Sequence, residues 1–304
     1  MSSFERKKDY SKVVIDDVRR LVQASREIGK PILAIPNEEC IICYYGCMPF
    51  VTIYEDKWIA FSHSYNKYFM EKDVLTEIER DYRKFLLNPA ENWKNLAVVL
   101  NAIWKGLPND TEKHTQHLIA CNNQSFNVGD YYVCGVETSI PTAFMKNGHK
   151  PEIDFVALSP INMEMLMIEY KCKYRSLYPT KGAGIRDHWI DYTLIKRKAD
   201  EIGFVHEMLN AYYLLCDIEG KAIPAIKEDE IRLGVAFLLT GNNYKDNEGV
   251  SKKANDSAIK KILKMDTLIE DEKFTDQDRR ELLWYWEEDY KNVRFDRNNF
   301  KTVC

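Results

Sequence analysis

Three ionisable residues lie within two apolar segments of the kind that form buried strands. Asp154 lies at the start of segment 153–158, and Glu169 and Lys171 lie at the end of segment 165–171. Because residues two apart on a strand point to the same face, Glu169 and Lys171 should project together. A hairpin between the segments would bring Asp154 beside them. The pattern predicts a divalent-metal site at a sheet end; the alternative is a partly buried Glu169–Lys171 ion pair on an edge strand.

These residues resemble the signature of the PD-(D/E)XK nuclease superfamily, an Asp early in one core strand and a (D/E)-x-K on the next. The matching segments are Pro151-Glu152-Ile153-Asp154 and Glu169-Tyr170-Lys171. Pro151 precedes Asp154 by three residues instead of being adjacent, which departs from the usual pattern. The resemblance implies an α/β fold with a restriction-endonuclease-like core (αβββαβ), in which helices flank a mixed central sheet.

The resemblance also implies a metal-dependent nuclease that hydrolyses phosphodiester bonds, with DNA as the favoured substrate. Asp154, Glu169 and the backbone carbonyl of Tyr170 would bind Mg²⁺ or Mn²⁺, and Lys171 would assist the attacking water. Mg²⁺ prefers oxygen ligands, lowers the pKa of bound water and polarises phosphoryl oxygens. Both the carboxylates and the ammonium suit this chemistry.

Two further acids are candidate metal ligands. Glu112 begins a predicted helix, where many members of the superfamily place a supporting acid, and Glu137 lies in the strand before the motif. The alternative for Glu112 is a first-turn acid favoured by the helix dipole. The alternative for Glu137 is an exposed strand position.

A basic segment follows the motif. Residues 171–198 contain eight Lys/Arg and two Asp, a balance of about +6, although the whole chain has a net charge of −4. Such a segment could neutralise a phosphate backbone, or could be the solvated face of a helix. The residues expected to contact nucleic acid are Lys173, Arg186, Tyr192, Lys196 and Arg197.

Cys40, Cys43 and Cys47 form a C-x2-C-x3-C cluster that could bind zinc or an iron–sulfur cluster. A tetrahedral site would need a fourth ligand supplied by the fold. The neighbouring residues are apolar and aromatic, as in a strand that enters a core, and buried free cysteines are common. We therefore expect the three to be core thiols rather than a metal site.

Hydrophobic periodicity and turn residues predict a chain in three parts. Residues 1–108 form an accessory α/β region with helices over 11–28, 72–87 and 91–105 and strands within 40–62. Residues 109–242 form the nuclease-like core, with a helix over 112–125, strands over 131–137, 152–158 and 165–173, helices over 187–202 and 204–216, and a strand over 231–239. Residues 243–304 form a C-terminal helical extension, with helices over 251–269 and 276–291.

The composition is that of a globular protein, 45% hydrophobic and 30% charged. Residues 1–12 are charged and lack the apolar core of a secretory signal, and no segment approaches the roughly 18 apolar residues of a membrane span. We therefore expect a cytoplasmic protein with reduced cysteines, no membrane partner, and a homodimer as one arrangement to test. The alternative functions are a non-catalytic nucleic-acid-binding or assembly protein that keeps the fold, a metal or redox protein built on the cysteines, and an interaction protein without a site.

Overall fold

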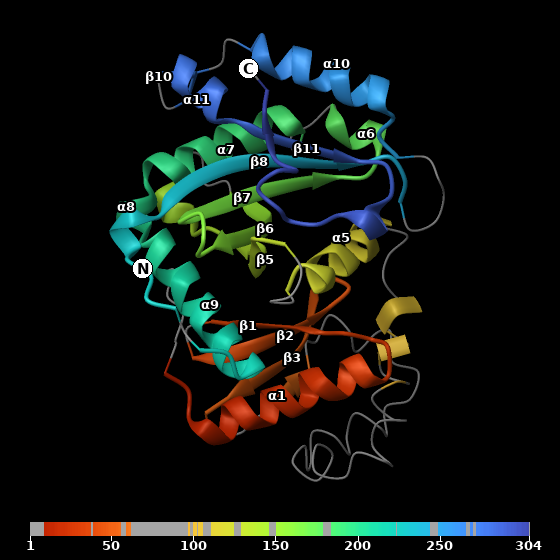
Figure 1. Cartoon of the computed structure of the whole chain (residues 1–304), viewed down its shortest axis with the longest axis vertical. Helices are drawn as coiled ribbons and strands as arrows, with labels where there is room; N and C mark the ends of the chain where they lie inside the picture. Colours follow the sequence, from red (N-terminus) through yellow and green to blue (C-terminus); the bar gives the residue numbers. More distant parts are fainter. Residues whose placement is uncertain are drawn as a thin grey trace. The chain divides into compact units, whose positions relative to one another are not determined.

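The computed structural model of the chain (Figure 1) is a mixed α/β structure. It divides into two compact units, a larger unit of residues 1–4, 118–209 and 225–304, and an N-terminal unit of residues 5–117 and 210–224. The structure describes residues 9–37, 39–55, 59–61, 97, 100–101, 103–105, 111–124, 129–145, 150–178, 184–222, 224–243, 249–265, 268–269 and 272–303.

The N-terminal unit packs a helix on an antiparallel sheet. Helix α1 (Lys12–Glu27) begins where the Ser11 hydroxyl accepts a hydrogen bond from the Val14 amide, and it is followed by Gly29 at φ 68°. Its apolar face joins the unit's hydrophobic core. The sheet has the order β1-β2-β3-β4, formed by β1 (Leu33–Pro36), β2 (Cys40–Tyr45), β3 (Met48–Tyr54) and β4 (Ile59–Phe61).

These elements confirm the predicted helix over 11–28 and the predicted strands within 40–62, whereas β1 was not predicted. The expected helix over 72–87 lies outside the described residues, and only part of the expected helix over 91–105 lies within them.

A six-stranded mixed sheet of order β12-β11-β8-β7-β6-β5 forms the centre of the larger unit. Strands β5, β6 and β7 pair antiparallel, β8 runs parallel to β7, and β11 runs parallel to β8. The bounds of the strands are β5 (Tyr132–Ser139), β6 (Glu152–Ser159), β7 (Glu164–Lys171), β8 (Arg232–Thr240), β11 (Leu283–Glu287) and β12 (Lys301–Thr302). The expected strands over 131–137, 152–158, 165–173 and 231–239 are confirmed.

Helix α5 precedes β5 in the chain, helices α6 to α11 lie in the connections between later strands, and α7 contacts both β7 and β8. In Figure 1 helix α7 runs alongside β8. Their bounds are α5 (Thr111–Asn122), α6 (Tyr174–Leu177), α7 (Ile185–Arg197), α8 (Ala199–Ile202), α9 (Phe204–Glu219), α10 (Lys252–Leu263) and α11 (Asp276–Glu281). Short 3-10 turns cover Thr142–Phe144, Glu228–Glu230 and Tyr290–Asn292, and a small hairpin joins β9 (Leu268–Ile269) to β10 (Glu272–Lys273).

The prediction of a helix over 276–291, and with it a purely helical C-terminal extension, is wrong. The capping box of Thr275 and Asp278 does start a helix, but α11 ends at Glu281 and residues 283–287 form β11. The sequence Leu-Trp-Tyr-Trp-Glu favours a strand because large aromatic residues pack well on a pleated surface, and β8 offers a free edge. The predicted helix over 251–269 is also shorter, because α10 ends at Leu263.

The two tryptophans of β11 share one face of the strand. Trp284 and Trp286 are two apart on a strand, so they project together. The Trp284 indole donates to Asn255 Oδ1 at 2.6 Å, and the Trp286 indole donates to the Val250 carbonyl at 2.8 Å. Both rings thus fix α10 and the segment before it to the sheet.

Among the described residues, no helix combines the length and the apolar character needed to cross a membrane.

Candidate active site

Three acidic residues form a row across neighbouring strands of the large sheet. The β5–β6 register pairs Val136 with Phe155 and Thr138 with Ile153, which places Glu137 opposite Asp154. The β6–β7 register ends at Phe155–Ile168, and one further step would place Asp154 opposite Glu169. Residues directly opposite in an antiparallel pair lie on the same face. The register thus places Glu137, Asp154 and Glu169 in one row across three neighbouring strands.

The sheet opens between β6 and β7 at this row. Strand β6 stays paired with β5 as far as Glu152, and β7 stays paired with β8 as far as Lys171, but the β6–β7 pairing ends at Phe155. Asp154 Oδ2 accepts the Tyr170 backbone amide at 2.8 Å, which replaces a ladder bond between the strands. Separation of the strands makes room for a carboxylate where a continuous ladder would place backbone atoms.

Glu169 lies at the centre of a buried network. Its side chain is 1% exposed, and its Oε1 is 2.5 Å from Lys171 Nζ and 3.0 Å from His188 Nε2. The Tyr192 hydroxyl donates to its other oxygen, Oε2, at 2.5 Å, and lies 3.1 Å from the Glu152 carbonyl oxygen. His188 and Tyr192 are four apart on α7, so one helix face delivers both. The helix thereby fixes the orientation of the carboxylate.

Burial and like charge act together on this network. Removal from water raises the pKa of Glu169, Lys171 and the Tyr192 hydroxyl act to lower it, and the charge of Glu137 raises it further. Burial also raises the pKa of Tyr192 well above its usual value, and the charges of Glu169 and Asp154 add to that shift. The site thus holds three acidic side chains beside a single lysine, Lys171, and this composition suits an additional cation.

The donor set of the row fits a hard divalent cation, because Mg²⁺ takes carboxylate oxygens and needs only one or two of them. Within the described ranges, however, no three His, Cys, Asp or Glu side chains already surround a common point as metal ligands. Both oxygens of Glu169 contact protein donors, so cation binding would require the carboxylate to exchange one of those contacts.

The other residues that were predicted to bind a metal or nucleic acid differ in their surroundings. Glu137 adopts φ 47°, a strained conformation for a residue other than glycine, within the acidic row. Glu112 lies in the first turn of α5 and belongs to the N-terminal unit, so its part in the site stays a prediction. Lys173 immediately precedes α6, and Arg186 is exposed near the start of α7.

Lys196 and Arg197 bind acidic residues of α11. Lys196 Nζ contacts Glu281 Oε2, and Arg197 donates to Asp278 Oδ2 at 2.7 Å. Both basic side chains are 26% exposed. These two ion pairs attach the end of α7 to the C-terminal segment, and a role in binding phosphate would compete with them.

The cysteine cluster lies in the core of the N-terminal unit. Cys40 and Cys43 belong to β2, Cys47 follows it at φ 53°, and all three are buried free thiols. Burial raises the pKa of Cys43 to about 12, and neighbouring Cys40 adds to the shift. Buried thiols of this kind pack as small apolar side chains.

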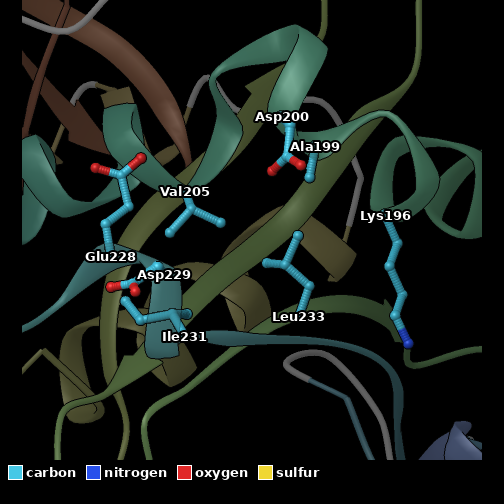
Figure 2. A pocket seen from close by; sticks show the side chains of 8 residues that line it. All are labelled: Lys196, Ala199, Asp200, Val205, Glu228, Asp229, Ile231 and Leu233. Carbon is cyan, nitrogen blue, oxygen red and sulfur yellow. The ribbon is translucent and has the colours of Figure 1, made fainter.

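A separate groove of about 540 Å³ lies beyond the C-terminal end of α7 (Figure 2). Acidic side chains of Asp200, Glu228 and Asp229 surround an apolar floor that includes Ile231 and Leu233. The remaining lining residues are Lys196, Ala199 and Val205. Three carboxylates would repel a phosphate backbone, so this groove does not extend the candidate active site.

Sequence reasoning missed His188. The six histidines of the chain show no metal-binding motif, and the sequence alone predicts no role for His188. Its position four residues before Tyr192 on the predicted helix was the available signal, because that spacing places both side chains on one face. The packing of α7 on β7, which the sequence does not predict, is what brings His188 to Glu169.

Comparison of the chain with protein-family models, with curated proteins and with solved structures gives no match.

Proposed function

We propose that the protein is a metal-dependent phosphodiesterase of the PD-(D/E)XK type, acting on nucleic acid and most readily on DNA. The observation that carries the proposal is the row of Glu137, Asp154 and Glu169, with Lys171 bound to Glu169 at 2.5 Å. Acidic residues placed side by side repel one another, and Glu169 is also buried, so the row costs stability; such arrangements concentrate at functional sites.

The chain order supports the proposal. Helix α5, strands β5, β6 and β7, helix α7 and strand β8 follow one another as in the αβββαβ core of the superfamily. The acidic row lies on the β5–β6–β7 meander, and β7 leads through α7 to the parallel strand β8. These relationships support the order of elements that the resemblance implies.

In this proposal the residues of the chain divide the work of hydrolysis. Glu137, Asp154 and Glu169 would hold Mg²⁺ or Mn²⁺, which when bound supplies Lewis-acid activation of water and of a phosphoryl oxygen. Lys171 places a positive charge beside Glu169, where it can orient the attacking water and stabilise charge that develops on the phosphate. The Tyr170 carbonyl is a further proposed ligand.

His188 and Tyr192 act on the carboxylate rather than on substrate. By donating to opposite oxygens of Glu169 they limit its rotation, as outer-shell partners do around metal-ligating carboxylates. Lys173 and Arg186, near the starts of α6 and α7, are the proposed phosphate contacts, and Lys196 and Arg197 bind acids of α11.

One observation favours a second candidate, a non-catalytic nucleic-acid-binding or assembly protein. Glu169 is satisfied on both oxygens by protein donors, so the network could serve only to fasten α7 to the sheet. If the network is purely structural, disrupting it should lower the stability of the protein. If it is catalytic, disrupting it should lower activity more than stability.

The test measures cleavage of labelled single- and double-stranded DNA and RNA with Mg²⁺ or Mn²⁺, using wild type beside Asp154→Asn. Asn keeps the size of the side chain and removes its charge. We expect metal-dependent cleavage by wild type and a loss of several hundredfold or more in the variant, since metal-centred charge stabilisation contributes several kcal/mol, roughly 10³ in rate.

Glu201→Gln is the matched control, because it removes one carboxylate from an exposed position on α8. Cleavage by Asp154→Asn at the wild-type rate, or persistence of wild-type cleavage in excess chelator, would reject the proposed site. Absence of cleavage by wild type, together with retained nucleic-acid binding, would favour the non-catalytic candidate.

A further inference from the structure

An exposed pair of tyrosines follows the candidate active site. Tyr174 and Tyr178 lie at and just beyond α6, three and seven residues after Lys171. They are 56% and 38% exposed, which places them among the few exposed large hydrophobic residues of the described chain. Their rings meet edge to face with centroids 6.5 Å apart.

The two rings differ in what covers them. Lys261 of α10 places its ammonium 4.1 Å from the centre of the Tyr178 ring, so one face of that ring holds a cation. Tyr178 is thereby braced against α10, and its edge-to-face contact in turn orients Tyr174. Tyr174 is the more exposed of the two and presents its ring to solvent.

Charge around the pair is positive. Arg175 is exposed between the tyrosines, Lys173 immediately precedes them, and Lys261 lies on Tyr178. Burial raises the pKa of Tyr178 to about 12, with a further contribution from Tyr174, so its hydroxyl stays neutral at physiological pH. Exposed aromatic rings among cations are the features with which proteins bind unpaired bases and their phosphates.

We propose that the Tyr174–Tyr178 pair is a stacking surface for unpaired bases, so that the substrate of the candidate active site is single-stranded or frayed nucleic acid. The inference rests on the proposed function and names its substrate class. Tyr174 lies three positions after Lys171, so their Cα atoms lie within about 11 Å. One bound strand could therefore contact both the tyrosine and the candidate active site.

The test measures binding rather than cleavage, in an Asp154→Asn background that holds substrate without cutting it. Three labelled probes of equal length are compared: oligothymidylate, an abasic strand with the same phosphates, and a blunt duplex. We expect oligothymidylate to bind more tightly than the other two. Tyr174→Ala should weaken oligothymidylate about five- to a hundredfold, because a base–aromatic stack contributes about 1–3 kcal/mol.

Two further variants separate stacking from charge. Tyr174→Phe keeps the ring and should bind oligothymidylate nearly as wild type does. Arg175→Ala removes a phosphate contact and should weaken oligothymidylate and the abasic strand equally, with a smaller salt dependence for both. Because both positions are exposed, we expect each variant to fold, and circular dichroism verifies this.

Equal weakening of oligothymidylate and the abasic strand by Tyr174→Ala would overturn the proposal, and so would equal binding of duplex and single strand by the parent protein. Failure to bind any probe would also overturn it and would favour a protein partner on this surface. Failure of the proposed function has a different signature: single-strand binding that depends on Tyr174, with no metal-dependent cleavage by the wild-type protein.

Discussion

Strand β7 carries two buried glutamates with contrasting surroundings. Glu164 at its start binds the Tyr131 hydroxyl and lies 3.3 Å from Arg297 Nε, whereas Glu169 near its end binds Lys171, His188 and Tyr192. Five residues separate the two glutamates, so they project from opposite faces of the sheet. These two contacts of Glu164 both involve its Oε2, whereas the contacts of Glu169 use both oxygens, and burial alone does not distinguish the two carboxylates.

The difference lies in the acidic neighbours. Glu137 and Asp154 share the row of Glu169, and the charge of Glu137 raises the pKa of Glu169. The start of β7 instead joins an aromatic cluster in which Tyr131 and Phe295 both contact Phe300. The contacts of Glu164 are thus typical of a structural ion pair, whereas the surroundings of Glu169 are typical of a site that can accept a cation.

The comparison predicts its largest effect for Glu169→Gln. If Glu169 binds the metal as proposed, loss of its charge should lower the cleavage rate on the order of a thousandfold, because metal-centred stabilisation contributes several kcal/mol. The measurement is the single-turnover rate with Mn²⁺. If Glu164→Gln reduced the rate as much as Glu169→Gln does, the proposed distinction between the two ends of β7 would be wrong.

His117 extends the comparison to a buried group that is neutral. Burial lowers its pKa to about 4, against an ordinary value of 6.5, despite its contact with the Pro31 carbonyl at 2.9 Å. The unfolded chain therefore binds more protons between these values, and stability falls as pH falls from about 6.5 to 4. Lowering the pKa of His117 from 6.5 to about 4 corresponds to a loss of about 3 kcal/mol of folding stability below pH 4.

We expect His117→Gln to lose this pH dependence, which urea unfolding between pH 7 and pH 4 would measure. His206→Gln changes an exposed histidine and is the matched control. A parallel fall in the stability of wild type and His117→Gln would show that His117 is not the group that titrates.

A smaller effect is expected from Tyr192→Phe. The change removes the hydroxyl that donates to Glu169 Oε2 and leaves the aromatic ring of residue 192 buried. Loss of an outer-shell partner typically costs ten- to a hundredfold in metal affinity or activity. Titration of activity with Mn²⁺ should show a raised metal requirement, and an unchanged titration would remove Tyr192 from the site.

The smallest effect should come from Glu164→Gln, and it should be on stability rather than on activity. Gln retains an acceptor for Tyr131 but loses the charge opposite Arg297, whose side chain is 38% exposed. Solvent screening at Arg297 limits the loss to about 1–2 kcal/mol. Thermal unfolding measures it, with cleavage expected to stay within about twofold of wild type.

Much of the sheet could be predicted because its strands are apolar segments bounded by turns. The positions of Asp154, Glu169 and Lys171 followed from strand periodicity. The register could not be predicted, and the register is what aligns Glu137 with Asp154. His188 was missed for a related reason, since only the packing of α7 on β7 gives that histidine a partner.

The C-terminal strand was missed because local signals conflicted. The capping box at Thr275 correctly predicts a helix start, but nothing local predicts that the helix would stop after six residues. The aromatic segment that follows gains more by pairing with β8 than by continuing a helix, and β8 is about forty residues away in the chain. Nonlocal pairing of this kind overrides propensity.

The parallel pairing of β11 with β8 has a consequence during synthesis. Strand β8 leaves the ribosome well before residue 283. Its edge facing β11 therefore stays unpaired until β11 is synthesised, whereas β5, β6 and β7 are already available to pair. An open edge of Val235, Phe237 and Leu239 is a template for association with other nascent chains. A chain truncated before residue 283 would keep every residue of the acidic row, but it would lack β11. Its exposed β8 edge would then promote aggregation.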